Sequence, residues 1–384
     1  MLPAVFGVGT VEYLVAGVLQ DISHDTGVSD ATVGLLITAY AVTVMIGGPL
    51  LTVLTTRVPR TPLIVALMTT FVLGNIGTAL TPNFATLVVF RIITALPHAT
   101  FFALCLVLAT SLVEPQYQGR VIARVALGLN LATVLGVPLG TLVSNGLGWR
   151  WSFALVAIFQ TIVTIALVLA TRRAPSHPTG SIAAEIKVFT KAPVLWALAL
   201  TALSQAALFV LFTYIAPFLT DTAGFSSGTV TILLFVFGAG SVLGNQLGGH
   251  FADKSIDRTL YVAITALVVT LALLAVFGGQ RWFVAPWLFV LGATGFAIIP
   301  PLASKLISAA SAAPHLAATV NIAGFQLANA AGAWIGSLAL SLGAEVSILP
   351  LVGAVLGAAA MALLVASRAG SRSAAVPSRP REQP

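Results

Sequence analysis

Apolar stretches long enough to cross a membrane recur along the whole sequence and are separated by short polar breaks. A helix of about 20 apolar residues spans the roughly 30 Å of hydrocarbon in a bilayer, whereas a barrel strand would show about ten residues of alternating polarity. Stretches such as LVVTLALLAVF show no alternation. The chain is 58% hydrophobic and 8% charged, more apolar than a soluble core requires. The sequence therefore predicts an all-α integral membrane protein.

Twelve transmembrane helices are predicted. The first apolar stretch begins almost at Met1 and lacks the basic region and cleavage site of a signal peptide, so we expect it to be a retained helix. The approximate bounds of the twelve spans are 2–19, 33–55, 62–81, 84–112, 121–144, 151–171, 193–219, 227–250, 259–278, 283–307, 316–342 and 346–366.

The distribution of basic residues predicts the orientation of the chain. If both termini are cytoplasmic, fifteen of the eighteen Lys and Arg residues lie on that side, while Arg150 and Arg281 lie outside and Arg91 lies within a span. This asymmetry is the positive-inside pattern, and it fits an even number of spans. The net charge of +7 therefore mainly reflects the orientation of the chain in the membrane. The sequence contains no basic domain that would indicate binding to nucleic acid. The single cysteine, Cys105, excludes an internal disulfide.

A polar interior segment divides the spans into two groups of six. Residues 172–192 hold Pro, Gly, Ser and much of the basic charge, which predicts a cytoplasmic linker between an N-terminal bundle, 1–171, and a C-terminal bundle, 193–366. The tail, 367–384, lacks apolar periodicity, so we expect it to be disordered.

The two groups of spans carry a weak internal repeat. An offset of 197 residues maps Gly47 onto Gly244 and Arg57 onto Lys254, and this offset is close to half the chain length. Duplication of a six-span unit is typical of transporters with a substrate site at the membrane midplane between their halves.

Two loops resemble the cytoplasmic signature of the major facilitator superfamily, Gly-x-x-x-Asp-Arg-x-Gly-Arg-Arg/Lys. They read GGPLLTVLTTRVPRT after the second span and GNQLGGHFADKSIDR after the eighth. The first copy departs from the signature at Thr56, in the acidic position, and at Pro59, in place of the central glycine. The resemblance implies that the loops form a cytoplasmic gate, with Gly47, Arg57, Arg60, Gly249, Asp253 and Lys254 as its residues.

Two spans narrow the resemblance to exporters. RIITALPHATFFA, 91–103, is similar to the fourth-span motif of exporters, although Ala95 stands where glycine is usual. GLNLATVLGVPLGTLV, 128–143, resembles the fifth-span antiporter motif through Gly136, Pro138 and Gly140. These glycines either serve close helix packing or control antiport conformations. Together the motifs resemble twelve-span drug:proton antiporters, especially the bacterial chloramphenicol-resistance and arabinose-efflux-like branch.

The resemblance implies two pseudo-symmetric six-helix bundles of the major facilitator fold in a bacterial inner membrane, with both termini cytoplasmic. It also implies alternating-access export of small amphipathic compounds in exchange for protons. We expect a monomer in the lipid bilayer whose partners are a small-molecule substrate and protons. We expect no enzymatic activity, cofactor, metal or nucleic acid.

Three ionisable side chains are predicted deep in the membrane: Glu12, Arg91 and His98. Glu12 is about ten residues, or near 15 Å, from either end of its span. Arg91 and His98 are seven residues apart, so they share one face of a helix, and we expect both to face the central cavity. Charged groups at this depth are costly and mark functional pathways, so the three predict proton coupling. Alternatively, Arg91 bonds carbonyl groups at a span end, His98 is a neutral packing residue and Glu12 is a protonated structural acid.

Neutral polar and aromatic residues within the spans predict a substrate cavity. Buried amides need a partner or a wet cavity, and Asn321, Phe325 and Asn329 share one helical face. The predicted cavity residues are Asn130, Gln205, Phe101, Phe209, Asn321, Phe325 and Asn329. Hydrogen bonding between helices, or packing and lipid contact for the aromatic rings, would explain the same residues without a substrate.

Three functions remain open on the sequence alone. Proton-driven export of small amphipathic compounds, with chloramphenicol as one candidate, agrees with the exporter-like spans and the buried acid. Transport of a sugar or another metabolite, arabinose-like, in either direction would use the same polar cavity. A membrane receptor or enzyme without transport would need a ligand-binding or catalytic constellation, and the sequence shows no His-Glu-x-x-His motif or large soluble domain.

Overall fold

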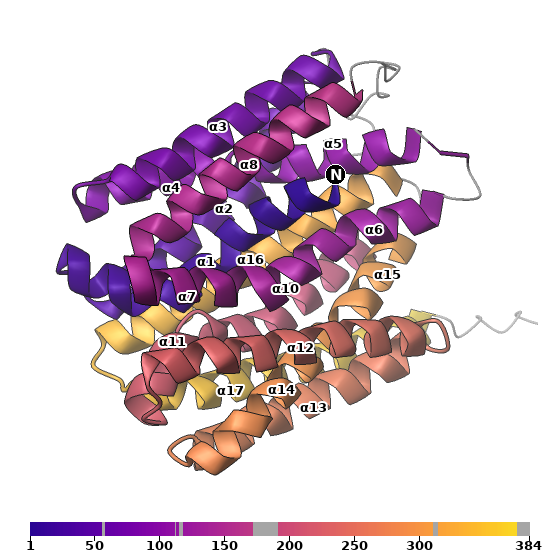
Figure 1. Cartoon of the computed structure of the whole chain (residues 1–384). Coiled ribbons are helices and arrows are strands. Elements are labelled where there is room, and N and C mark those ends of the chain that lie inside the picture. Colours follow the sequence, from indigo (N-terminus) through magenta and orange to yellow (C-terminus); the bar gives the residue numbers. More distant parts are fainter. Residues whose placement is uncertain (56–57, 112, 115–117, 172–190, 310–313, 375–384) are drawn as a thin grey trace, which may run out of the picture.

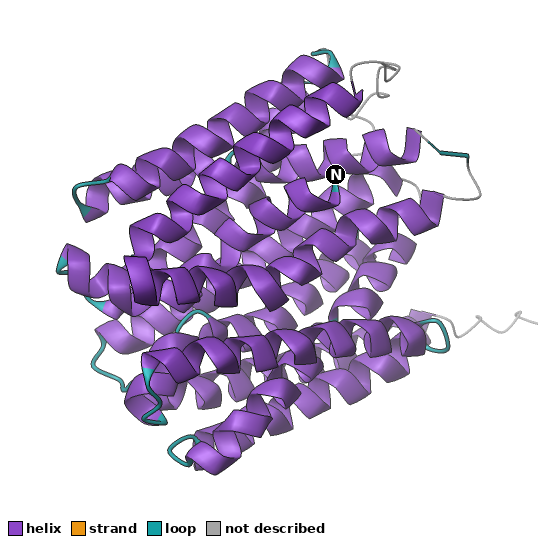
Figure 2. Cartoon of the chain, in the orientation of Figure 1, coloured by secondary structure: helices purple, strands orange, loops and turns teal. Residues whose placement is uncertain are grey.

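The structure is a computed structural model that describes residues 1–55, 58–111, 113–114, 118–171, 191–309 and 314–374. These residues form long helices that run roughly parallel or antiparallel to one another, with no strand in the described ranges (Figures 1 and 2). The predicted all-α fold is confirmed. The predicted linker residues 172–190, the tail residues 375–384, Thr56 and Arg57 lie outside the described residues.

The N-terminal half contributes the six spans of the first bundle. Its elements are α1 (Leu2–Thr26), α2 (Asp30–Leu54), α3 (Arg60–Leu80), α4 (Phe84–Ala95), α5 (His98–Ser111), α6 (Gln118–Leu131), η2 (Ala132–Gly136), α7 (Val137–Leu147) and α8 (Trp149–Thr171). The pair α4 and α5 forms the fourth span, and α6, η2 and α7 form the fifth.

The C-terminal half contributes the second bundle. Its elements are α10 (Ala192–Phe212), α11 (Ile215–Pro217), η4 (Phe218–Thr222), α12 (Ser227–Ala252), α13 (Ile256–Phe277), α14 (Arg281–Ala297), α15 (Ile299–Ala309), α16 (Pro314–Ser341), η5 (Val346–Ile348) and α17 (Leu349–Ala374). α17 continues to Ala374 through the first part of the segment that we expected to be a disordered tail.

Each predicted span falls on one helix or on a run of consecutive helices. In the described part, eleven segments have the length and hydropathy needed to cross a membrane, and α16, with 28 residues, is the twelfth long helix. α1 is the most buried of the eleven, whereas outer helices expose apolar stripes. On α8, for example, Ile158, Ile162 and Ile165 are more than half exposed at helical spacing. Such stripes face hydrocarbon in a membrane protein.

In the N-terminal bundle two spans are interrupted where prolines occur. α4 ends at Ala95 and α5 begins at His98, with Leu96 and Pro97 between them. Pro97 has no backbone N–H to continue the helical bonding, which explains the break. In the fifth span a π-helical turn, Ala132–Gly136, directly precedes Pro138 in α7. Single π turns of this kind often occur at functional positions.

The two bundles meet most closely at one end of the molecule, which we call the α1–α2 end because it carries the loop between those helices. α2 packs along α16 across the bundle boundary, and Figure 1 shows α7 beside α12 at the left of the view while α6 diverges from α12 toward the right. The opposite end, which carries the loop from α2 to α3, is called the α2–α3 end.

Hydrogen bonds between the bundles gather at the α1–α2 end. Gln20 of α1 donates to the Thr220 hydroxyl at 2.8 Å and to the Asp221 carboxylate at 3.1 Å. Asn145 of α7 donates to the Thr231 hydroxyl of α12 at 3.2 Å. In addition, Ser337 of α16 donates to the carbonyl oxygen of Ala31 in α2 at 2.8 Å. These contacts close the α1–α2 end between the bundles.

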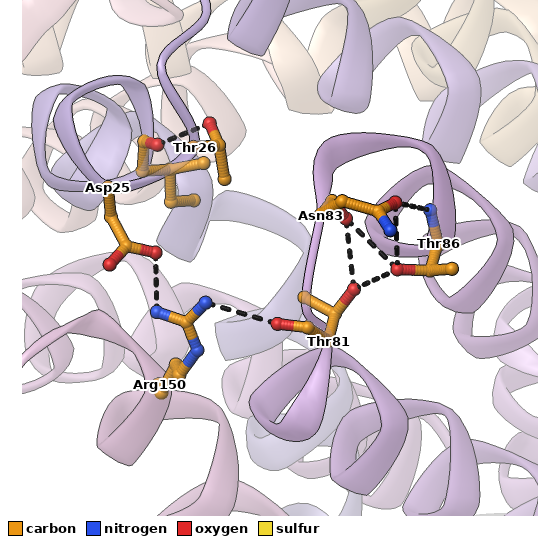
Figure 3. Close-up of polar contacts among 7 residues, drawn as sticks. Asp25, Thr26, Thr81, Asn83, Thr86 and Arg150 are labelled. Atoms are coloured by element: carbon orange, nitrogen blue, oxygen red, sulfur yellow. Dashed lines mark hydrogen bonds and ion pairs between the residues drawn. The ribbon is translucent and has the colours of Figure 1, made fainter.

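The two basic residues that we predicted outside the membrane both lie at the α1–α2 end and are held by the protein. Arg150 of α8 forms an ion pair with Asp25 of α1 and donates to the carbonyl oxygen of Thr81 at 3.1 Å (Figure 3). Arg281 donates to the carbonyl oxygens of Ala223, at 3.2 Å, and Gly224. These two cations therefore fix loops that join consecutive spans.

Candidate functional site

Glu12 of α1 is the carboxylate buried at the boundary between the bundles. Its side chain is 4% exposed. The Gln326 side-chain amide of α16 donates to Glu12 Oε1 at 2.7 Å, and His98 Nε2 of α5 lies 3.6 Å from Glu12 Oε2. The carboxyl group thus has neighbours in both bundles.

A chain of side chains connects Glu12 to Arg91. The Tyr40 hydroxyl of α2 lies 2.9 Å from His98 Nδ1, so the imidazole contacts Tyr40 on one side and Glu12 on the other. The Arg91 guanidinium of α4 lies over the Tyr40 ring, 4.4 Å from its centroid. A cation in this position is attracted to the negative face of the ring. The order Arg91, Tyr40, His98, Glu12 uses four different helices of the N-terminal bundle.

Arg91 is fully buried and only partly hydrogen-bonded. One terminal nitrogen donates to the carbonyl oxygen of Val11, next to Glu12, at 3.0 Å. In the described part, its other terminal nitrogen and Nε have no hydrogen-bond partner, and no ion pair within 4.0 Å joins it to Glu12. The alternative that Arg91 bonds a carbonyl group is therefore seen, but at the middle of α1 and not at a span end.

The helix break at Pro97 changes the geometry that the sequence suggested for Arg91 and His98. We predicted that one unbroken helix carries both side chains on a single face, but Arg91 lies on α4 and His98 is the first residue of α5. Both side chains are buried, at 0% and 3% exposure. They reach the same cluster through Tyr40, and neither faces lipid.

An aromatic cluster lies beside Glu12 and crosses the bundle boundary. The Tyr13 ring of α1 stacks on Phe209 of α10 at a centroid distance of 6.3 Å, and Phe212 meets Tyr13 edge-on at 6.0 Å. Phe212 stacks in turn on Phe237 of α12 at 5.0 Å. Of the predicted aromatic cavity residues, Phe209 belongs to this cluster.

The other two predicted aromatic residues lie elsewhere. Phe101 is fully buried in the hydrophobic core of the N-terminal bundle, and Phe325 is half-buried on α16.

The predicted amides lie on three helices. Gln205 of α10 donates to the carbonyl oxygen of Gly295 at 3.3 Å, and Asn329 of α16 is 2% exposed. Asn130 of α6 and Asn321 of α16 are half-buried. The side-chain oxygens of Gln205, Asn321 and Gln326 have no hydrogen-bond partner in the described part of the chain. Buried acceptors of this kind suit a ligand that carries hydrogen-bond donors.

The glycines of the fifth-span motif pack against α1. A Cβ atom on Gly136 would lie 2.1 Å from the Thr10 hydroxyl, and one on Gly140 would lie 2.2 Å from Leu14 Cδ1. Both glycines therefore provide close packing inside the N-terminal bundle. This span also contacts the other bundle at Val134, whose Cα lies 2.5 Å from the position of a Cβ on Gly238. Pro138 is buried just after the π-helical turn.

The predicted gate residues lie at the α2–α3 end, except for Arg57, which is outside the described residues. Gly47 is half-buried on α2, and Arg60 begins α3. Gly249 accepts the backbone N–H of Asp253 at 3.2 Å, which ends α12. Lys254 is exposed, with its ammonium 5.7 Å from the Phe251 ring centroid.

Sequence reasoning missed two residues of the Glu12 cluster. Tyr40 carries a polar group within an apolar span, and this was a visible signal. The sequence shows Gln326 as one of several amides in its span, but nothing in the sequence distinguishes it from Asn321 or Asn329. Its contact with Glu12 joins residues 314 positions apart.

This geometry, two six-span bundles around a buried midplane site, is the arrangement of a secondary transporter. The sequence profile of the Major Facilitator Superfamily matches residues 1–337. The chain belongs to this superfamily.

Relatives with assigned names agree with this membership. The inner membrane transport protein YdhP of Escherichia coli K12 is 36% identical over 362 residues, covering 94% of this chain and 93% of the relative. The chloramphenicol resistance protein of Streptomyces lividans is 34% identical, covering 88% of this chain and 87% of the relative.

A solved structure has the same fold. It is the crystal structure of a bacterial homolog of the human lysosomal transporter Spinster, in an inward-facing and unoccupied conformation. The superposition gives a TM-score of 0.69 at 19% identity, covering 95% of this chain and 92% of that chain.

Proposed function

We propose that this chain exports small amphipathic compounds in exchange for protons by alternating access. One observation carries the proposal: the Glu12 carboxyl is buried between the bundles, with His98 of one bundle and Gln326 of the other as its neighbours. A group placed between two bodies that move relative to each other has different surroundings in each arrangement. It can therefore bind a proton in one arrangement and release it in the other.

The contact between Gln326 and Glu12 links the proton to the bundle movement. When the carboxyl is an anion, the bond from the Gln326 amide is charge-assisted and about twice as strong as a neutral bond. Protonation removes the charge and weakens this contact between the bundles. The Arg91 cation, placed behind Tyr40, favours the anion and so promotes proton release.

The substrate-binding surface combines aromatic rings and amides. The cluster of Tyr13, Phe209 and Phe212 offers aromatic faces, and the side-chain oxygens of Gln205 and Asn321, which have no partner among the described residues, can accept hydrogen bonds from a ligand. This combination suits a compound with a ring and several N–H or O–H groups. The name of the Streptomyces lividans relative makes chloramphenicol the first compound to test.

The α2–α3 end faces the cytoplasm in this proposal, because Arg60, Lys254 and Arg258 lie there and the sequence pattern assigns most Lys and Arg residues to the cytoplasmic side. Both termini are then cytoplasmic and the protein is a multi-pass monomer of a bacterial inner membrane. In this orientation the end closed by Gln20, Asn145 and Ser337 is the outer end, which supports an inward-facing state. Residues of the two signature loops, from Gly47 and from Gly249 onward, would close the gate on the cytoplasmic side.

The test compares Glu12→Gln with a control in which an exposed carboxylate is changed, Glu345→Gln, after reconstitution into liposomes. We expect Glu12→Gln to fold and to exchange labelled substrate at equal pH, but to lose uphill transport driven by a pH gradient. Glu345→Gln should behave as the parent protein. Full gradient-driven export by a well-expressed Glu12→Gln protein would exclude Glu12 as the proton carrier and transfer this role to His98.

A sugar or another metabolite is the second candidate substrate. The buried amides of α10 and α16 favour it, because hydroxyl-rich ligands need several hydrogen-bond partners. Resistance to a panel of drugs in an efflux-deficient bacterial host would support drug export. Accumulation of a labelled sugar or its release, without any resistance, would support this second candidate.

A further inference from the structure

An apolar groove opens on the outer surface of the C-terminal bundle, between α12, α13 and α14. Its volume is about 540 Å³. It extends from the α2–α3 end toward the middle of the helices, and its lining includes the small residues Gly244, Gly248, Ala263, Ala266, Ala293 and Ala297.

The groove exists because α12 and α14 approach each other through glycines. A Cβ atom on Gly244 would lie 2.0 Å from the carbonyl oxygen of Ala293, and one on Gly248 would lie 2.2 Å from that of Ala297. The backbones are thus in contact, and the small side chains leave a hollow beneath the exposed Leu247 and Val262. The shape follows from helix packing and is part of the folded protein.

Two cations lie at the end of the groove where the helices leave the membrane. Lys254 and Arg258 are exposed and both line it, together with Ser255, the N-cap of α13. The Lys254 ammonium lies above the Phe251 ring, which also lines the groove. Asp257 is bonded to Lys305 of α15 at 2.9 Å and does not line the groove. The groove therefore joins an apolar channel to a positively charged mouth.

The length of the groove matches one leaflet. From Gly244 of α12 to Lys254, two residues beyond the end of that helix, is ten residues, or about 15 Å at 1.5 Å per residue. This is half of the roughly 30 Å of hydrocarbon in a bilayer. A phospholipid whose phosphate lies at the cations would place one acyl chain along the groove.

A second groove in the same molecule lacks the charged mouth. It lies between α3 and α8, has a volume of about 420 Å³, and is lined by residues that include Val65, Met68, Thr69, Thr164 and Leu169. No Lys, Arg, His, Asp or Glu lines it. The cations are therefore a feature of the groove between α12, α13 and α14 and are not found at every groove on the outer surface.

We propose that the groove between α12, α13 and α14 binds one anionic phospholipid, with its phosphate between Lys254 and Arg258 and one acyl chain over Ala263 and Ala266. Each cation near an anionic headgroup contributes about 1 kcal/mol, or about a fivefold change in affinity. The proposal is independent of the transported substrate, because the groove faces away from Glu12 and opens to the bilayer.

The experiment titrates delipidated, detergent-purified protein with phosphatidylglycerol or phosphatidylcholine and counts bound lipid by native mass spectrometry. We expect one phosphatidylglycerol to bind more tightly than phosphatidylcholine. Arg258→Gln should lower the affinity for phosphatidylglycerol about fivefold, and Arg258→Lys should keep the affinity of the parent protein. Ala266→Leu, which fills the groove, should lower the affinity for both lipids. The matched controls are Arg124→Gln, an exposed cation on α6, and Thr69→Leu in the uncharged groove, and both should bind as the parent protein does.

Three outcomes would overturn the proposal. Equal affinity of the parent protein for the two lipids would mean that the acyl chains alone determine binding and that the cations do not recognise the headgroup. A loss in Arg124→Gln as large as in Arg258→Gln would indicate general surface charge. Competition by glycerol phosphate at the concentration of the lipid would indicate a site for a free phosphate group and not for a phospholipid.

Discussion

The two bundles share one helical plan but differ in the chemistry of their buried surfaces. Of its described Asp, Glu, Lys, Arg and His residues, the N-terminal bundle buries three, Glu12, Arg91 and His98. The C-terminal bundle buries amides and hydroxyls, and none of its described Asp, Glu, Lys, Arg or His residues is buried. One bundle therefore carries the charges, and the other meets them through a neutral amide, Gln326.

This difference shows how a duplicated fold can divide a task between its copies. Charges are costly in the membrane, so gathering them in one bundle allows Arg91, Tyr40 and His98 to compensate one another. The second bundle then needs only groups that respond to a charge. An amide does so without a charge of its own, since it donates more strongly to an anion than to a neutral acid.

The strongest test of this comparison exchanges the two groups. The double variant Glu12→Gln with Gln326→Glu keeps a carboxyl and an amide 2.7 Å apart but moves the acid to the C-terminal bundle. Because the acid then no longer has His98 as its neighbour in the same bundle, we expect gradient-driven export to stay at background. Transport into or out of proteoliposomes under an imposed pH gradient measures this. Recovery of export in the double variant would show that either bundle can carry the acid.

A second test removes the cation. We expect Arg91→Met to lower gradient-driven export about 10- to 100-fold, because hydrogen bonds to charged groups contribute about 1.5–3 kcal/mol. Arg91→Lys keeps the charge but not the planar group above the Tyr40 ring, and it should be intermediate. Initial export rates at matched protein levels measure the effect. If Arg91→Met transports like the parent protein, the cation has only a packing role.

A third test concerns packing within the charged bundle. Gly136→Ala places a methyl group against Thr10, and we expect it to lower the free energy of unfolding by about 1–3 kcal/mol. The matched control, Gly146→Ala in the same span, has no atom within 4 Å of the new Cβ and should leave stability unchanged or slightly raised. Thermal unfolding in detergent distinguishes them. Equal melting temperatures for the two variants would contradict the close contact between α1 and the fifth span.

The smallest expected effect comes from Tyr40→Phe, which removes the hydroxyl beside His98 and keeps the ring under Arg91. A single hydrogen bond contributes about 0.5–1.5 kcal/mol, so export should fall about two- to tenfold. The response to external pH, measured in the same vesicles, should shift because His98 loses one neighbour. An unchanged rate together with an unchanged pH profile would remove Tyr40 from the chain that links Arg91 to Glu12.

The fold could be predicted because its main determinant is local. A stretch of about 20 apolar residues is sufficient for a membrane helix, whatever its neighbours are. The helix break at Pro97 was also visible in the sequence, but we treated that span as continuous. Its consequence, that Arg91 and His98 meet through Tyr40 and not along one helix face, depends on the position of α2.

The contacts across the bundle boundary could not be predicted for a physical reason. Glu12 and Gln326 are neighbours only in one arrangement of two bodies, and helical periodicity says nothing about that arrangement. The glycines at positions 136 and 140 illustrate the same limit. Their spacing predicts a close helix contact, but only the structure shows that the partner is α1 of the same bundle.

In the proposed alternating-access cycle, the hydrogen bonds that close the α1–α2 end help to set how often the protein changes state. Gln20, Asn145 and Ser337 are uncharged, and water replaces their partners when the bundles separate there. A bond between two neutral groups then contributes only about 0.5–1.5 kcal/mol, and the bond from Gln20 to the Asp221 carboxylate contributes about 1.5–3 kcal/mol. A difference of a few kcal/mol leaves the minor state populated at roughly 0.1–10%, so thermal motion alone samples it. In the proposed transport cycle, a proton bound or released at Glu12 would then shift the balance between the two conformers.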